Sequence, residues 1–252
     1  MKKQLIIVLS MVISICVSSI AQDPIEKGNI LKYNLTPTAF GIYSMQYERV
    51  LNPKQTIAIS FSVAPNVELP FKSTLLNLYG DNAEARSAIE STVFNNFSIT
   101  PEYRFYIGPK GAPVGFYLSS FMRYSHMSHS QLYQFTTSEG NIHKPEITTE
   151  FNGFGVGEMI GIQWLFGKQQ NIVLDWWIIG PYFGYLTGTS HGTDDMSDMD
   201  AQDKTDLEND IESLNIPLWT IDATVGDGVV DADLKGAYYG SRLMGICIGI
   251  KF

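Results

Sequence analysis

The sequence alternates apolar and polar residues over eight stretches, each long enough for one β-strand. The clearest is 56–63, in which Ile57, Ile59, Phe61 and Val63 take every second position and Thr, Ser or Ala residues take the positions between them. Because successive side chains of a strand point to opposite faces, this period of two predicts strands with one apolar and one polar face. The predicted strands are 29–36, 43–49, 56–63, 97–107, 115–126, 154–166, 172–185 and 238–252.

Short and long connections alternate between these strands. The short turns, rich in Gly, Pro, Asn or Lys, lie near residues 53, 110 and 168, and the long connections span 64–95, 127–150 and 189–236. Turn residues of this kind suit tight reversals between antiparallel neighbours. The rhythm predicts an all-β, eight-stranded antiparallel arrangement with short turns at one end and long loops at the other.

Charged residues fall mostly on the polar faces of the predicted strands. If those faces turn inward in a closed barrel, seven charged side chains meet inside it: Lys32, Glu48, Glu102, Arg104, Arg123, Asp175 and Lys251. Eight strands leave an interior that side chains fill, and buried charges need partners, so we expect a salt-bridged plug. A narrow polar path is the alternative. Glu158 breaks the pattern by falling on the apolar face, which a bulge or a position near the rim would explain.

The connection 189–236 carries the unbalanced charge of the chain. It holds 13 Asp and Glu residues against two Lys, so its net charge is 2 − 13 = −11, compared with −9 for the whole sequence. A solvated acidic face is one reading, and self-repulsion should keep such a loop extended. A calcium-binding site is the more specific hypothesis, with Asp198, Asp200 and Asp203 as candidate oxygen ligands. The residue spacing of a known calcium-binding loop is absent.

Short elements are predicted inside two of the long connections. Thr205-x-x-Glu208 has the spacing of a capping box and predicts a short helix, and Asp81-x-x-Glu84 predicts another helix in the second loop. Alternation over 219–225 before Gly226-Asp227-Gly228 predicts a hairpin.

Residues 1–21 have the features of a secretory signal peptide. Lys2 and Lys3 precede an apolar run over 5–17, and small residues stand before Gln22, where we expect the mature chain to begin. Cleavage there gives a domain of residues 22–252 with a net charge of −9 − 2 = −11 and one cysteine, Cys247, hence no intramolecular disulfide. The mature sequence has no apolar run of about 18 residues, so crossing a bilayer would require a closed barrel.

The last predicted strand places Ile248, Ile250 and Phe252 on one face and ends the chain on an aromatic residue. With the alternating strands, this resembles the small outer-membrane β-barrel proteins of Gram-negative bacteria, the OmpA/OmpX-like eight-stranded group. The resemblance implies an eight-stranded antiparallel transmembrane β-barrel with long extracellular loops and periplasmic termini. It also implies that Phe252, with Ile250 and Ile248, is read by the barrel assembly machinery, and that lipid and lipopolysaccharide surround the barrel.

We therefore expect a non-enzymatic outer-membrane barrel whose loops serve surface interaction or envelope integrity. No nucleotide, haem or zinc motif is present, so we expect no cofactor and no nucleic-acid partner. One alternative is a secreted lipocalin-like binding barrel, in which charged faces would point to water and apolar faces to a core.

The other alternative is a lipid A acyl hydrolase. His126 and Ser128, with Glu139 further on, bring together a base, a nucleophile and a carboxylate, and are similar to the His-x-Ser pattern of outer-membrane lipid A deacylases. The chain departs from that pattern because His129 stands where an Asn is expected and Glu139-Gly140 reverses the usual order.

Overall fold

The structure is a computed structural model that describes residues 28–69, 71–79, 83–132, 134–136, 140–195, 197, 199–213 and 217–252. Strands make up most of this part of the chain, and the main sheet is antiparallel. The predicted signal peptide and its cleavage site before Gln22 lie outside the described residues and stay predictions.

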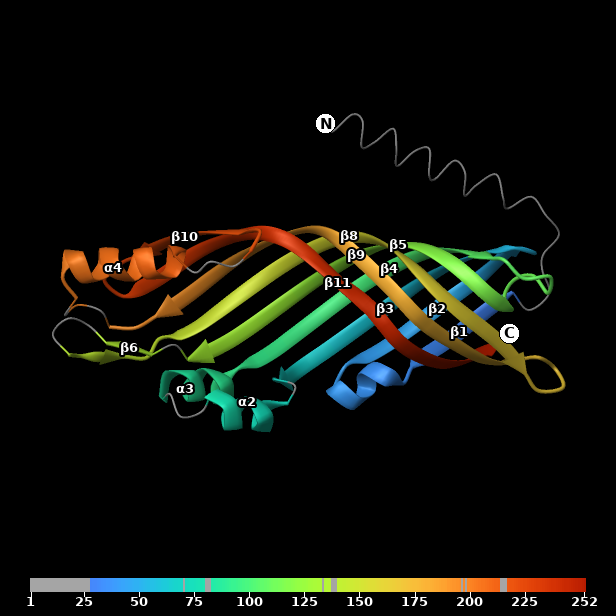
Figure 1. Cartoon of the computed structure of the whole chain (residues 1–252), viewed down its shortest axis with the longest axis horizontal. Helices are drawn as coiled ribbons and strands as arrows, with labels where there is room; N and C mark the ends of the chain where they lie inside the picture. Colours follow the sequence, from blue (N-terminus) through green and yellow to red (C-terminus); the bar gives the residue numbers. More distant parts are fainter. Residues whose placement is uncertain are drawn as a thin grey trace, which may run out of the picture.

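Eight strands of the main sheet close into a ring (Figure 1). In ring order they are β1 (Asn29–Asn34), β2 (Tyr43–Asn52), β3 (Gln55–Glu68), β4 (Val93–Tyr106), β5 (Gly115–Leu132), β8 (Glu146–Phe166), β9 (Ile172–Thr193) and β11 (Val229–Lys251). β11 pairs back with β1, Ile30 lying opposite Lys251 and Asn34 opposite Cys247. The strands predicted from alternation are confirmed, and so is their antiparallel order.

The longer strands continue well beyond the predicted limits at the end that carries the long connections. β5 extends to Leu132, β8 begins at Glu146, and β9 and β11 pair with each other as far as Thr193 and Val229. The extensions of β5, β8 and β9 are rich in Thr, Ser and Gly, so their sequence lacks the apolar period. Backbone hydrogen bonds to a neighbouring strand hold them in the sheet.

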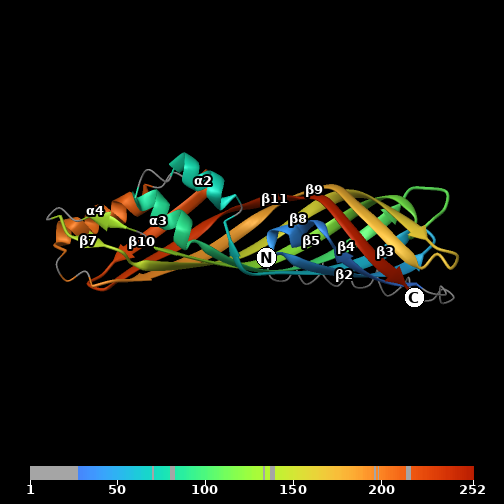
Figure 2. The same ribbon diagram turned by 90° about the horizontal axis from the view of Figure 1, so that it is seen from below.

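Helices border the same end of the ring. η1 (Thr36–Phe40) joins β1 to β2, α2 (Lys72–Tyr79) and α3 (Ala83–Ser91) join β3 to β4, and α4 (Ala201–Glu212) follows β9. A small hairpin of β6 (Phe135–Thr136) and β7 (Ile142–His143) lies between β5 and β8. Figures 1 and 2 both show α2, α3 and α4 far from the end of the ring where the chain terminates. None of the helices in the described part of the chain is long and apolar enough to cross a membrane.

The two faces of the ring strands differ in the way the alternation predicts. On β3, Ile57 and Phe61 are 39% and 43% exposed on the outer side, whereas Thr56 and Ser60 are buried inside. The same division recurs around the ring, where exposed side chains are mostly aromatic or aliphatic and the buried set includes Lys, Arg, Glu and Asp. The ring is therefore polar inside and apolar outside.

The described part of the acidic connection is folded, so the prediction that it stays extended is wrong. β10 (Trp219–Val225) pairs with β11 and confirms the predicted hairpin. Four residues form a small apolar core between α4 and this hairpin, namely Met199, Leu207, Val225 and Val230. Burial of this core offsets the repulsion between the exposed carboxylates.

The start of α4 also differs from the prediction. Its N-terminal cap is Asp200, whose carboxylate accepts hydrogen bonds from the N–H groups of Gln202 and Asp203, and not Thr205. Glu208 instead turns to β10, where it accepts from the N–H of Val225 at 2.8 Å. The helix predicted after Asp81 is present as α3, and Asp81 itself lies outside the described residues.

Candidate functional site

Asp175, on β9, is the centre of a charge network inside the ring. Its Oδ2 accepts from Lys32 Nζ at 2.7 Å, from Arg104 Nη1 at 2.8 Å and from Trp177 Nε1 at 3.1 Å. Its Oδ1 accepts from the Tyr117 hydroxyl at 2.8 Å. Four donors from four strands thus converge on one buried carboxylate, which fixes the position of each of those strands.

Glu48, on β2, is the second carboxylate of the network. Lys32 Nζ donates to its Oε2 at 2.5 Å, and the hydroxyl of Tyr106 donates to its Oε1 at 2.9 Å. Lys32 also donates to Gln163 Oε1 at 2.9 Å, so all three protons of its ammonium group are used.

Glu102, on β4, completes the network toward the loop end. Arg104 donates to its Oε2 at 2.9 Å, and Arg242 Nη1 donates to its Oε1. Gln46 bridges the two partners, because its side-chain oxygen accepts from Arg104 and its nitrogen donates to Glu102. The network thus balances three cations with three carboxylates: Lys32, Arg104, Arg242, Glu48, Glu102 and Asp175.

Two residues predicted for this network do not belong to it. Arg123 lies inside the ring but nearer the loops, and it forms no ion pair with a carboxylate among the described residues. Its Nη1 donates to Thr100 Oγ1 at 3.3 Å, and its guanidinium stands 5.9 Å from the centre of the Tyr182 ring. Lys251 is half-buried at the opposite end, in the last paired position of β11, and it forms no ion pair with the network in the described chain.

Arg242 was not predicted to face inward, because counting back from the end of the chain places it on the apolar face. The reason is an irregularity in β11. Met244 has a left-handed backbone with φ of 49°, and Leu243 and Met244 both point outward. Ile178 is a matching extra residue on β9, since Ile179 pairs with Leu243 and Trp177 with Gly245. The alternation therefore shifts by one residue, and Arg242 turns inside.

Aromatic rings form a layer above the charges. The rings of Tyr182 on β9 and Tyr238 on the neighbouring β11 lie 5.1 Å apart, and the Tyr238 hydroxyl donates to Ser125 Oγ at 2.8 Å. Glycines on β8, the neighbour of β9, make room for them: a Cβ at Gly153 or Gly155 would come within 3.1 Å of these rings. The layer separates the charge network from a cup-shaped cavity of about 570 Å³ at the mouth of the ring.

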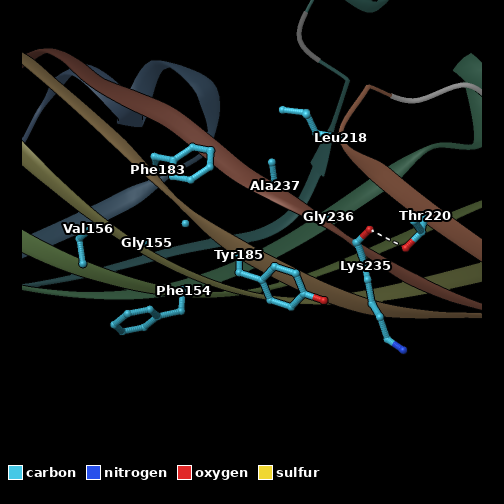
Figure 3. A pocket seen from close by; sticks show the side chains of 11 residues that line it. Phe154, Gly155, Val156, Phe183, Tyr185, Leu218, Thr220, Lys235, Gly236 and Ala237 are labelled. Atoms are coloured by element: carbon cyan, nitrogen blue, oxygen red, sulfur yellow. Dashed lines mark hydrogen bonds between the residues drawn. The ribbon is translucent and has the colours of Figure 1, made fainter. Parts of the chain in front are cut away.

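A second cavity, of about 720 Å³, is a groove on the outer wall across β8, β9 and β11 (Figure 3). Glycines form its floor, and a Cβ at Gly184 would collide with the carbonyl oxygen of Phe154. In Figure 3 the Lys235 side chain extends away from the sheet, and Thr220 donates to the Lys235 carbonyl oxygen at 3.3 Å. The lining is otherwise apolar, so this groove can hold hydrocarbon but offers no set of catalytic groups.

Glu158 faces outward, as the alternation indicated, and lies neither at the rim nor at a bulge. The register shift of β8 comes after it, between Ile160 and Gly161. Its carboxylate accepts from Ser120 Oγ at 2.7 Å, which gives this outward charge one partner. The pair borders a further outer groove of about 1090 Å³, whose lining is mostly apolar.

The hydrolase candidates His126 and Ser128 lie on β5 and share one face of that strand. His126 Nδ1 lies 3.2 Å from Asn152 Oδ1, an oxygen that also accepts from the Tyr124 hydroxyl. Glu139 lies outside the described residues. The structure therefore places the base beside an amide. Glu150 lies opposite Ser128 on β8, but among the described residues no hydrogen bond joins His126 to Ser128 or either of them to a carboxylate.

The calcium candidates do not converge either. Asp200 uses its carboxylate to cap α4, Asp203 lies in the first turn of that helix, and Asp198 lies outside the described residues. Within the described ranges no cluster of three or more His, Cys, Asp or Glu side chains is arranged to hold a metal ion. Asp227 pairs with a lysine of α4: Lys204 donates to Asp227 at 2.6 Å, and this bond holds the pKa of the Asp227 carboxyl below its usual range.

The residues of the predicted assembly signal lie at the seam of the ring. Ile248, Ile250 and Phe252 are 48%, 56% and 53% exposed on its outer side. Phe252 also exchanges two backbone hydrogen bonds with Asn29, at 2.8 and 3.0 Å. The last residue therefore closes the ring through its backbone while it presents its side chain outward.

The geometry of the interior is that of a filled, charge-balanced plug beneath an open aromatic cup. Comparison of the sequence with models of known protein families and with curated proteins finds no match.

Proposed function

We propose that this protein is a non-enzymatic, eight-stranded β-barrel of a Gram-negative outer membrane, with its termini on the periplasmic side and its long connections outside the cell. The observation that carries the proposal is the inverted distribution of side chains on the ring. Apolar residues cover the outer face of its strands, and charged residues lie inside.

The outer face argues for a hydrocarbon environment. Met45 on β2, Phe61 on β3 and Ile160 on β8 are each more than 40% exposed, and comparable residues lie on the other ring strands. Soluble proteins rarely expose contiguous apolar patches larger than a few hundred Å². A belt that continues around the ring is typical of the lipid-facing wall of a barrel. In the lipocalin-like alternative the apolar residues would instead line the interior.

The interior argues for a structural role. Arg104, Tyr106 and Tyr117 are fully buried and cross the ring from neighbouring strands, and their hydrogen bonds to Asp175 and Glu48 hold them there. Because the paired charges fill the cross-section, we assign binding and surface contacts to the loop end. The aromatic cup, α4 and the β10–β11 hairpin all lie on that side.

The plug leads to a prediction about transport. Reconstituted into a planar bilayer, the protein should give no large stable conductance, because the buried residues of the network leave no continuous aqueous path. A porin measured in the same bilayers serves as the positive control. Porin-like steps from the wild-type protein would show that the interior opens and would refute a plugged barrel.

Cell fractionation and gel migration test the location. The protein should appear in the outer-membrane fraction and should migrate faster on a detergent gel when unheated than after boiling, because hydrogen-bonded barrels resist detergent until heated. Recovery in the soluble fraction with unchanged migration would disprove the proposal. Mass spectrometry of lipid A from cells with and without the gene tests the hydrolase alternative separately, since we expect identical acylation.

A further inference from the structure

The cup at the mouth of the ring combines an aromatic lining with one arginine, Arg123. Phe94 stacks on His129 at 4.8 Å between ring centres, and Phe151 meets Trp219 edge-to-face at 5.6 Å. Tyr182 and Tyr238 also line it. Its volume of about 570 Å³ falls within the range of small-molecule sites, about 300–1,000 Å³.

Arg123 is the only charged residue among the described residues that line this cup. The network below it is already balanced, with three cations and three carboxylates, so Arg123 has no share in that neutralisation. Its one hydrogen bond is the 3.3 Å contact with Thr100, and its Nε is buried without a hydrogen-bond partner in the described chain. A guanidinium carries five N–H donors, so most of its donor capacity is unused.

An unneutralised guanidinium in a partly desolvated aromatic cup favours an anion. Carboxylate, phosphate and sulfate groups match the planar fork of arginine and can accept two of its hydrogen bonds at once. The acidic connection, with its net charge of −11, disfavours small bare anions near the mouth. An anion that binds here must therefore also gain from contact with the aromatic walls.

We propose that the cup binds an organic anion, with its carboxylate, phosphate or sulfate group on Arg123 and its apolar or aromatic body against Phe151, Tyr182 and Trp219. The site goes beyond the proposed function, because a structural barrel needs no ligand. The site requires only the ring and its mouth. A negative binding result would therefore refute the anion site without affecting the proposed membrane location.

Short, water-soluble probes test the proposal on the full-length mature protein folded in a neutral maltoside detergent. The probes are hexanoate, hexyl phosphate and benzoate, with hexan-1-ol and inorganic phosphate as controls. Binding is followed by the change in tryptophan emission, and the signal should disappear in Trp219→Phe because Trp219 lines the cup. Hexanoate or benzoate should bind clearly more tightly than hexan-1-ol.

Variants then assign the anion to Arg123. R123Q should weaken binding of the organic anions by about tenfold or more, since it removes a charge-assisted hydrogen bond. R123K should retain part of the preference for anions. R49Q is the matched control, because it removes the same charge on β2, where Arg49 contacts Asn29 at 2.7 Å outside the cup, and it should bind like wild type.

The outcomes separate clearly. A preference for hexanoate and hexyl phosphate over benzoate would identify a lipid-like anion, and the reverse preference an aromatic acid; either supports the site. Equal affinity of R123Q and wild type would overturn it, as would equal binding of hexanoate and hexan-1-ol. The second comparison uses only the wild-type protein, so it decides the matter even if R123Q does not fold.

Discussion

Asp175→Ala should be the most damaging single substitution in the ring. It removes a carboxylate that accepts from Lys32, Arg104, Tyr117 and Trp177, and it leaves the buried cations Lys32 and Arg104 each with one carboxylate fewer. Breaking a buried ion pair by removing one partner costs about 3–5 kcal/mol, and here two pairs share the lost group. The free energy of unfolding in urea, measured on protein refolded into detergent micelles, should fall by at least that amount.

The control for this substitution is Asp222→Ala, on β10. Asp222 is exposed on the hairpin, and exposed substitutions usually change stability by less than about 0.5 kcal/mol. If Asp175→Ala and Asp222→Ala unfold at the same urea concentration, the network does not stabilise the ring as described.

Arg104→Ala should have the second-largest effect. Arg104 is fully buried and pairs with Glu102, Glu48 and Asp175, so its removal leaves three carboxylates short of positive charge. The loss should again be about 3–5 kcal/mol. Loss of the unboiled, faster-migrating band at lower temperature gives an independent measure.

Arg123→Ala is the comparison that separates the network from the mouth of the ring. Sequence alternation gives Arg104 and Arg123 the same inward role, but Arg123 pairs with no carboxylate among the described residues and contacts Thr100. We therefore expect Arg123→Ala to cost much less than Arg104→Ala. Equal losses would mean that Arg123 is coupled to the network.

The sequence predicts the ring well because its strands obey a strict period of two. Lys32, Glu48, Glu102, Arg104 and Asp175 are found inside because each lies on the polar face of an uninterrupted stretch. Within such a stretch, each side chain stays on the side of the sheet that the alternation gives it.

Arg242 escaped prediction for the opposite reason. One extra residue in β11 near Met244, matched by Ile178 in β9, exchanges the inward and outward positions of the β11 residues that precede it. Neither Met nor Ile is a residue type that marks a bulge. The packing of the helix and hairpin in the acidic connection is not evident from the sequence, because its net charge of −11 favours an extended loop. Leu207, Val225 and Val230 are separated in sequence and meet only in the folded loop.

We propose that the outer face of the ring lies in hydrocarbon, and spin labels measure this directly. Cysteines placed at Phe61, Ile160 and Asp222 in a Cys247→Ser background would each carry a nitroxide in protein reconstituted into lipid vesicles. Labels at 61 and 160 should be relaxed by dissolved oxygen and shielded from a water-soluble nickel chelate, and the label at 222 should behave in the opposite way. Free access of the chelate to positions 61 and 160 would contradict the account.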